Sequence, residues 1–229
     1  MEGFRRYAIY VAPQPGTLAD FTAQWLGWDP ETGKAPVHPA LPGLPAPVAQ
    51  LTATPRKYGF HGTIKPPFRL AEDSDIFGLH ADMTALAATL APARFPALKL
   101  AQIGHFLALV PDGDAGTLPD LAATVVAGLD RHRAPLTEDD ITRRRPDRLS
   151  DSQRDLLMRW GYPYVMDEFR FHMTLTGRLQ PDQLQATADT LAPALTPLLP
   201  RPVRIDSLCL FGEGKDGRFH NLHRYALTG

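Results

Sequence analysis

The sequence predicts an α/β (α+β) fold with an internal duplication, and two observations carry this prediction. Alternating apolar segments, typical of strands, are interspersed with amphipathic or alanine-rich segments, typical of helices. The order strand, helix, strand, helix, strand occurs in the first half of the chain and again in the second, which indicates a repeated unit. Of the 229 residues, 44% are hydrophobic and 21% charged. This balance is that of a globular protein and excludes a disordered or fibrous chain.

The first half of the chain is predicted to open with a strand at 5–12, where apolar and aromatic residues are stopped by Pro13 to Gly16. A helix at 18–28 follows, with Thr17 as its N-cap. Residues 29–56 form a Pro- and Gly-rich loop, of a length that is often functional. The other elements of this half are a strand at 57–65 ended by Pro66 and Pro67, a helix at 74–91 capped by Ser74 or Asp73, and a strand at 96–103.

The second half repeats this order. It is predicted to contain a strand at 105–111, an amphipathic helix at 118–132, a short helix near 150–160, a strand within 169–176, a helix at 181–198, and two last strands near 202–211 and 218–227. We expect one bilobal domain over residues 1–229, with approximate lobes 1–104 and 105–229 and strand exchange between them left open. Either 29–56 or 134–168 is a candidate lid over a site.

Charge and cysteine content limit the function classes. The formal net charge is −1, so a nucleic-acid site would have to be a local patch, and we expect no DNA partner. The single cysteine, Cys209, lies in an apolar run and is expected in the core, which leaves no disulfide framework. No apolar run reaches the roughly 18–20 residues that span a bilayer, and the N-terminus lacks the pattern of a signal peptide. We therefore expect a cytoplasmic protein with no membrane partner.

Two histidines carry the functional signal. His61 and His172 each follow a phenylalanine and precede a threonine two residues on, in Phe-His-Gly-Thr-Ile and Phe-His-Met-Thr-Leu, and each lies on a predicted strand of its own half. Residues i and i+2 of a strand point to the same face. His61 with Thr63, and His172 with Thr174, can therefore line one cleft between two related lobes.

This set of side chains suits phosphodiester cleavage. Imidazole acts as a base or an acid near neutral pH, and hydroxyl groups donate hydrogen bonds to phosphoryl oxygens. A lone histidine on an apolar strand is more often a hydrogen-bonded core residue, and the pairing is what favours catalysis. We find no GxxxxGK[ST] phosphate loop and no HExxH motif.

The paired His-x-Thr strands resemble the 2H phosphoesterase superfamily. The segments Tyr7–Tyr10, Lys57–Phe68 and Phe171–Gly177 look closer still to its DUF1045 branch, whose members are described as phosphonate-metabolism proteins. The resemblance covers nearly the whole chain. It implies two α/β lobes related by a pseudo-twofold axis, with antiparallel-rich sheets facing a central groove. It also implies chemistry that needs no metal and no cofactor.

The resemblance implies roles for four residues. His61 and His172 would be the catalytic acid and base, with the assignment between them open, and Thr63 and Thr174 would bind the substrate phosphate. Gly62 departs from the bulkier residues common at that position, which we interpret as room for substrate or a tight backbone contact.

Several cations near the two motifs are weaker candidates for phosphate binding. Lys65 lies on the face of His61 if the strand has no bulge, as Lys57 does, and Arg170 lies on the face of His172. Tyr58 faces the other way and is expected in the core. The run Arg143–Arg148 is expected to be solvated, with a second phosphate or an RNA backbone as its alternative ligand.

These observations favour a cyclic phosphodiesterase that opens a small phosphorylated sugar or nucleotide, such as a ribose cyclic phosphate of phosphonate breakdown. One alternative is an enzyme that processes or ligates RNA ends bearing a 2′,3′-cyclic phosphate, which would need a continuous basic groove and exposed aromatic side chains. A second alternative is a non-catalytic binder of phosphate ligands. The sequence does not determine the oligomeric state.

Overall fold

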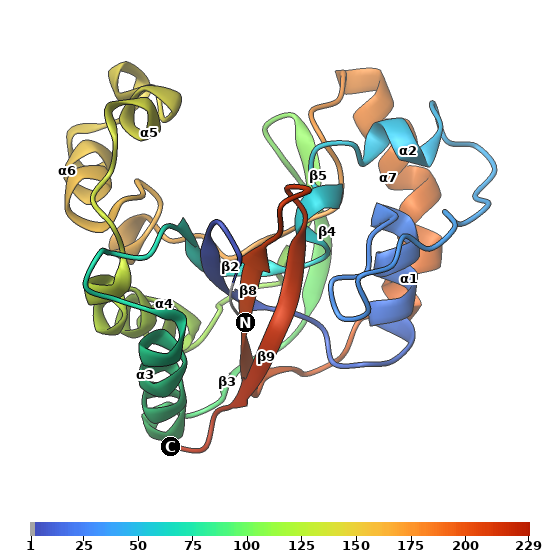
Figure 1. Ribbon diagram of the computed structural model, residues 1–229. Coiled ribbons are helices and arrows are strands. Elements are labelled where there is room, and N and C mark those ends of the chain that lie inside the picture. The colour runs from blue at the N-terminus through green and yellow to red at the C-terminus, as the bar shows by residue number, and fades with distance from the viewer. Residues whose placement is uncertain (1–2) are drawn as a thin grey trace.

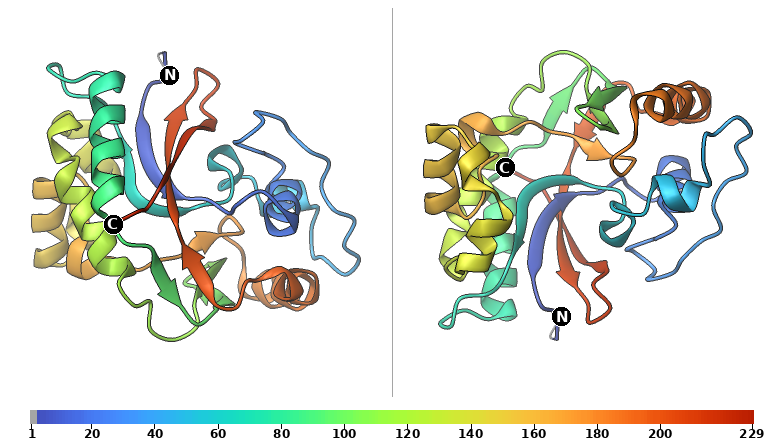
Figure 2. Two further views of the ribbon diagram at one scale, coloured as in Figure 1. Left: turned by 90° about the horizontal axis from the view of Figure 1, so that it is seen from below. Right: turned by 90° about the horizontal axis from the view of Figure 1, so that it is seen from above.

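The central feature of the fold is a seven-stranded sheet flanked by two groups of helices (Figures 1 and 2). The computed structural model describes residues 3–229. The sheet has the order β4-β5-β6-β2-β1-β8-β9, every neighbouring pair is antiparallel, and β3 and β7 form a separate antiparallel pair. The strands are β1 Tyr7–Val11, β2 Gly62–Phe68, β3 Ala93–Phe95, β4 Leu98–Ile103, β5 Phe106–Pro111, β6 Met173–Thr174, β7 Val203–Ile205, β8 Ser207–Glu213 and β9 Phe219–Ala226.

The helices gather in two groups. In Figure 1, α3 to α6 lie to the left of the strands, and α1, α2 and α7 lie to the right. Their bounds are α1 Thr17–Leu26, α2 Val48–Leu51, α3 Ile76–Thr89, α4 Leu118–Gly128, α5 Glu138–Arg143, α6 Asp151–Trp160 and α7 Pro181–Leu195. Short 3-10 helices lie at Arg56–Tyr58, Asp130–His132, Pro146–Arg148, Met166–Glu168 and Thr196–Leu198. The mixed α/β class with antiparallel strands is confirmed.

The two predicted motif strands are neighbours at the middle of the sheet. β2 and β6 pair antiparallel through Gly62 and Met173, which are the middle residues of the two His-x-Thr motifs. This register is symmetric, because it sets each histidine opposite the threonine of the other motif. A local twofold axis therefore lies between β2 and β6, where the half-sheet β4-β5-β6 meets the half-sheet β2-β1-β8-β9.

The two halves of the chain exchange strands across this axis. The C-terminal hairpin of β8 and β9 pairs with the N-terminal strand β1, from Tyr7 opposite Gly212 to Tyr10 opposite Cys209. β3, from the first half, likewise pairs with β7. The chain therefore crosses between the half-sheets more than once.

Side chains on the two faces of the sheet form two apolar clusters. The larger cluster contains Ile9, Ile64 and Met173 and packs against the helices. A smaller one, on the opposite face, contains Tyr10 and Cys209 with Ala8, Phe211 and Phe219. The predicted burial of Cys209 is confirmed, and this burial raises the pKa of its thiol to about 11.

Several element boundaries differ from the sequence prediction. The strand expected at 57–65 begins only at Gly62, because Lys57 and Tyr58 belong to a 3-10 helix and the chain turns at Gly59, which has φ 70°. The strand expected at 202–211 is two strands, β7 and β8. The N-cap of helix α3 is Asp75, one residue after Ser74 and two after Asp73, since the Asp75 carboxylate accepts the capping hydrogen bond from Gly78 N. No helix among residues 3–229 is long and apolar enough to cross a membrane.

Candidate active site

His61 lies in the short connection between the Gly59 turn and β2. Its Nδ1 is 2.9 Å from the Gly59 carbonyl oxygen, and its Nε2 is 3.2 Å from the Thr63 hydroxyl. A carbonyl oxygen only accepts hydrogen bonds, so Nδ1 carries the proton of the neutral ring. The Nε2 lone pair is then free to accept, and in the free protein the Thr63 hydroxyl donates to it.

His172 repeats this arrangement in the second half. Its Nδ1 is 2.9 Å from the carbonyl oxygen of Arg170, again the residue two positions earlier. The same reasoning leaves Nε2 as the unprotonated nitrogen of the neutral ring. The local backbone therefore orients both imidazoles alike, as the twofold register between β2 and β6 requires. The ring of Phe106 lies 6.0 Å from that of His172, centroid to centroid.

Burial sets the charge of His61. Its ring stacks on Tyr10, with centroids 3.8 Å apart and planes 22° from parallel. This burial lowers the pKa of His61 to about 4, against the opposing effect of the Gly59 carbonyl, and the neighbouring His172 lowers it further. At neutral pH His61 is therefore uncharged and able to take up a proton.

The two motifs line one pocket of about 590 Å³, whose wall includes His61, Thr63 and Thr174. His172 is not among the residues of this wall, but its ring lies beside that of Phe106, which is. The face alternation inferred from the sequence therefore holds for His61 and Thr63, and of the second motif Thr174 lines the pocket. Among residues 3–229, no three His, Cys, Asp or Glu side chains are grouped so as to hold a metal ion.

Lys65 does not reach this pocket, contrary to the interpretation of it as a phosphate ligand. Its side chain is 2% exposed, and its Nζ donates to Asp130 Oδ1 and to the carbonyl oxygen of Val126, each at 3.1 Å. The reason is a register shift. Ile9 pairs with Lys65 but Tyr10 pairs with Thr63, so Ile64 is an extra residue that forms a bulge in β2. The bulge turns Lys65 toward the face of the sheet that packs against the helices, which is the face of Ile9.

The other two flanking cations also lie outside the wall of the pocket. Arg170 is exposed and precedes β6, and its Nη1 donates to the carbonyl oxygens of Asp167 and Phe169. Lys57 lies with its Nζ 4.8 Å from the ring centroid of Tyr58. Tyr58 is half-buried and packs against the smaller apolar cluster, as expected, but it also lines the pocket.

Both segments considered as lids border the pocket. Thr54 and Pro55 come from the 29–56 segment, and Arg144 and Tyr162 from the long connection around 134–168. Sequence reasoning missed Tyr10 and Tyr162. Tyr10 had a signal, since it alternates with Ile9 on the first strand, whereas nothing local marks Tyr162.

Comparisons with known proteins show the family to which the chain is similar. The model of the family described as "Protein of unknown function (DUF1045)" matches residues 63–220. A protein named ribose 1,5-bisphosphate phosphokinase PhnN, from Janthinobacterium sp. (strain Marseille), is 36% identical over 192 residues, which is 83% of this chain and 42% of that protein. A protein of the same name from Laribacter hongkongensis (strain HLHK9) is 32% identical over 96% of this chain and 51% of its own. The chain thus spans about half the length of these curated relatives.

Solved structures with weak overall similarity were also found. The Escherichia coli protein LigT, complexed with 3′-AMP, aligns with a TM-score of 0.46 and 14% identity over 99% of both chains. The protein TT0787 of Thermus thermophilus aligns with a TM-score of 0.45 and 16% identity over 98% of both chains.

Proposed function

The chain belongs to the DUF1045 family, as the match over residues 63–220 shows, and we propose that it is a phosphoesterase that hydrolyses a small cyclic phosphodiester by two-histidine acid–base catalysis. The observation that carries the proposal is the symmetric pair of histidines. Each donates from Nδ1 to a backbone carbonyl two residues earlier, and each therefore presents Nε2 for proton transfer.

In the proposed reaction, His61 is the base and His172 is the acid. His61 is the choice for the base because burial lowers its pKa to about 4, which keeps the ring unprotonated at neutral pH. Its Nε2 takes a proton from water as the water oxygen attacks phosphorus. The bond from phosphorus to one ring oxygen breaks, and protonated His172 gives its proton to that oxygen. The product is a phosphate monoester with a free hydroxyl group.

Thr63 and Thr174 would stabilise the negative charge that develops on the phosphoryl oxygens. These two residues, one from each motif, both line the pocket. A hydroxyl rotates freely, so the Thr63 proton that points to His61 in the free protein can turn to a phosphoryl oxygen when substrate binds. Hydrogen-bond donors that are already in position before the reaction stabilise the transition state most where they point at the atoms on which charge develops.

The names of the relatives support a phosphorylated ribose as substrate. Both are named for ribose 1,5-bisphosphate. The kinase activity in that name has no counterpart among the motifs of this chain, which has no GxxxxGK[ST] loop. We therefore propose cyclic phosphodiester hydrolysis on a ribose phosphate rather than phosphoryl transfer from a nucleotide.

Phosphorus NMR on chelator-treated protein tests the proposal. Ribose 1,2-cyclic phosphate and a 2′,3′-cyclic nucleotide are incubated with wild type, His61→Ala and His172→Ala. The expected result is ring opening that survives chelation and falls about 10²- to 10⁴-fold in each variant. His223→Ala, an exposed histidine of β9, is the control and should keep the wild-type rate. Turnover that persists in both site variants contradicts the mechanism.

A further inference from the structure

A second cavity, of about 240 Å³, adjoins the histidine pocket. Arg6, Tyr58, Pro66, Pro67 and Arg144 line both cavities, so the two form one groove with a shared middle section. The histidines and threonines lie at one end of this groove. The other end lies between the last residues of β2, with Arg69 after them, and helix α5. We call it the basic end.

The wall of the basic end is strongly cationic. Seven of its side chains are Lys or Arg, and one, Asp140, is a carboxylate. Three carboxylates neutralise part of this charge: Glu213 pairs with Arg6, Asp130 with Lys65 and Arg133, and Asp140 with Arg69 and Arg143. Seven cations face three carboxylates, so an excess of four positive charges surrounds a small concave space.

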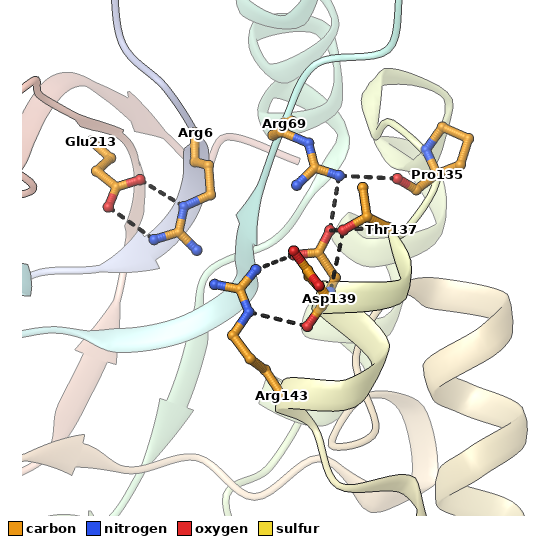
Figure 3. Close-up of polar contacts among 8 residues, drawn as sticks. Arg6, Arg69, Pro135, Thr137, Asp139, Arg143 and Glu213 are labelled. Atoms are coloured by element: carbon orange, nitrogen blue, oxygen red, sulfur yellow. Dashed lines mark hydrogen bonds and ion pairs between the residues drawn. The ribbon is translucent and has the colours of Figure 1, made fainter.

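The arginines there have bonding capacity left. Figure 3 shows Arg6, Arg69 and Arg143 coming from separate parts of the chain, each held by carboxylate or carbonyl oxygens. Arg6 binds Glu213 through Nε and Nη2, at 2.6 and 2.9 Å, and its Nη1 makes no hydrogen bond within residues 3–229. Burial alone would raise the pKa of Asp140, but hydrogen bonds from Arg69 and Thr137 hold that pKa well below its ordinary value. These pairs therefore stay charged and fixed.

Arg144 and Lys57 differ from the paired cations. Within the described part of the chain, neither forms an ion pair with a carboxylate. Each instead lies over an aromatic ring, with the Arg144 guanidinium carbon 4.6 Å from the Tyr162 centroid and the Lys57 Nζ 4.8 Å from that of Tyr58. Arg144 lies in the section that both cavities share. A cation so placed has its donors free for a ligand.

We propose that the basic end is a subsite for a phosphate monoester carried by the same substrate whose cyclic phosphate lies between the histidines. This inference rests on the proposed function and narrows it: the substrate class is a sugar that bears both a cyclic phosphodiester and a separate phosphate monoester. Arg144, Arg6 and Lys57 supply the donors, and an arginine suits the oxygens of a terminal phosphate because its planar fork makes two parallel hydrogen bonds.

The same contacts argue against a nucleic-acid strand. Single-stranded RNA binding needs free aromatic faces on which bases stack. At the basic end and its margin, one face of each of the rings of Tyr58, Tyr162 and Trp160 is occupied by a cation, the last by Arg159 at 4.8 Å. The cationic wall encloses a small cavity, which fits one anionic group better than a chain of phosphates.

The test compares ribose 1,2-cyclic phosphate with the same compound phosphorylated at O5. For wild type we expect kcat/KM to be at least 10-fold higher for the doubly phosphorylated compound. In Arg144→Met this preference should fall 10-fold or more, mainly through KM, because a hydrogen bond to a charged group is lost. Arg148→Met is the matched control, since Arg148 belongs to the same arginine run but lines neither cavity, and it should keep the preference.

The outcomes separate this inference from the proposed function. Equal kcat/KM values for the two compounds in wild type overturn the subsite and leave the hydrolase intact. If neither compound is hydrolysed, the proposed function fails, and calorimetric binding of the doubly phosphorylated compound decides the subsite. Binding that is lost in Arg144→Met and kept in Arg148→Met supports the subsite, and absence of binding overturns it. A preference for an RNA oligonucleotide ending in a 2′,3′-cyclic phosphate over both sugars also overturns it.

Discussion

Replacing Lys65 by methionine should reduce the stability of the fold while leaving the chemistry nearly unchanged. The sequence alone suggested that Lys65 binds the substrate phosphate. In the structure its ammonium group is buried against Asp130 and the Val126 carbonyl. The substitution therefore decides between a structural and a substrate-binding lysine at a position next to the first motif.

The expected magnitude follows from the contacts that are lost. The ammonium gives up two hydrogen bonds of 3.1 Å, and a hydrogen bond to a charged group contributes about 1.5–3 kcal/mol. Methionine has a similar length, and it avoids the cost of burying a charge. Asp130 keeps Arg133, at 2.8 and 3.0 Å. We therefore expect a net loss of about 1–2 kcal/mol for Lys65→Met.

Removing the partner should cost more than removing the lysine. Asp130→Ala leaves the Lys65 ammonium buried with only the Val126 carbonyl, and an unpaired buried charge destabilises by about 3–5 kcal/mol. Lys99→Met is the control, since Lys99 forms an ion pair with Asp112 in which both side chains are about half exposed. A pair of that kind contributes about 0–1 kcal/mol.

Urea denaturation and steady-state kinetics on the same preparations give the two readouts. The unfolding free energy should be highest for wild type and Lys99→Met, lower for Lys65→Met and lowest for Asp130→Ala. The m-values should be equal. Lys65→Met should keep kcat/KM within a few-fold of wild type. A variant of unchanged stability whose kcat/KM falls 100-fold or more would refute the reasoning and restore Lys65 as a phosphate ligand.

Two further predictions concern the motifs themselves. The kcat/KM of wild type should not fall as the pH is lowered from 7 to about 5, and should fall only as the pH approaches about 4, because His61 must be unprotonated to act as the base and its pKa is about 4. A pH series of initial rates that falls already near pH 6.5 contradicts this assignment. Gly62→Ala should destabilise the fold by about 1–3 kcal/mol in urea denaturation, since its added Cβ would lie 2.5 Å from Cζ of Phe171; wild-type stability would show that this ring moves aside freely.

The parts of the site that could be predicted from the sequence depend on local periodicity. His61 and Thr63 share a face because a strand alternates, and the same pattern recurs around His172. The symmetric contact between the motifs follows once the two strands pair. No long-range information was needed for these residues, because the histidine and the threonine of each motif are only two positions apart in the sequence.

The parts that could not be predicted depend on pairing between distant segments. The bulge that turns Lys65 inward appears only in the register of β2 against β1, and no residue type in that strand marks it. β6 is only two residues long, so Arg170 precedes it and face alternation says nothing about its side chain. In the sequence, Arg144 is one of several arginines expected to be solvated. Its contact with Tyr162 joins residues that lie before and after helix α6.

The two motifs differ at their middle residue, which is Gly62 in the first and Met173 in the second, and this difference explains how the motifs pack against each other. We interpreted this glycine as room for substrate or as a tight contact, and the structure shows the second, since Phe171 of the other motif occupies the space where a side chain would lie. Phe60 and Phe171 are both buried, so the phenylalanine before each histidine anchors its motif on the core side. One pair, Gly62 with Met173, joins the two half-sheets. Packing beneath that pair therefore sets the separation of the histidines, and a core substitution there should alter catalysis without touching either ring.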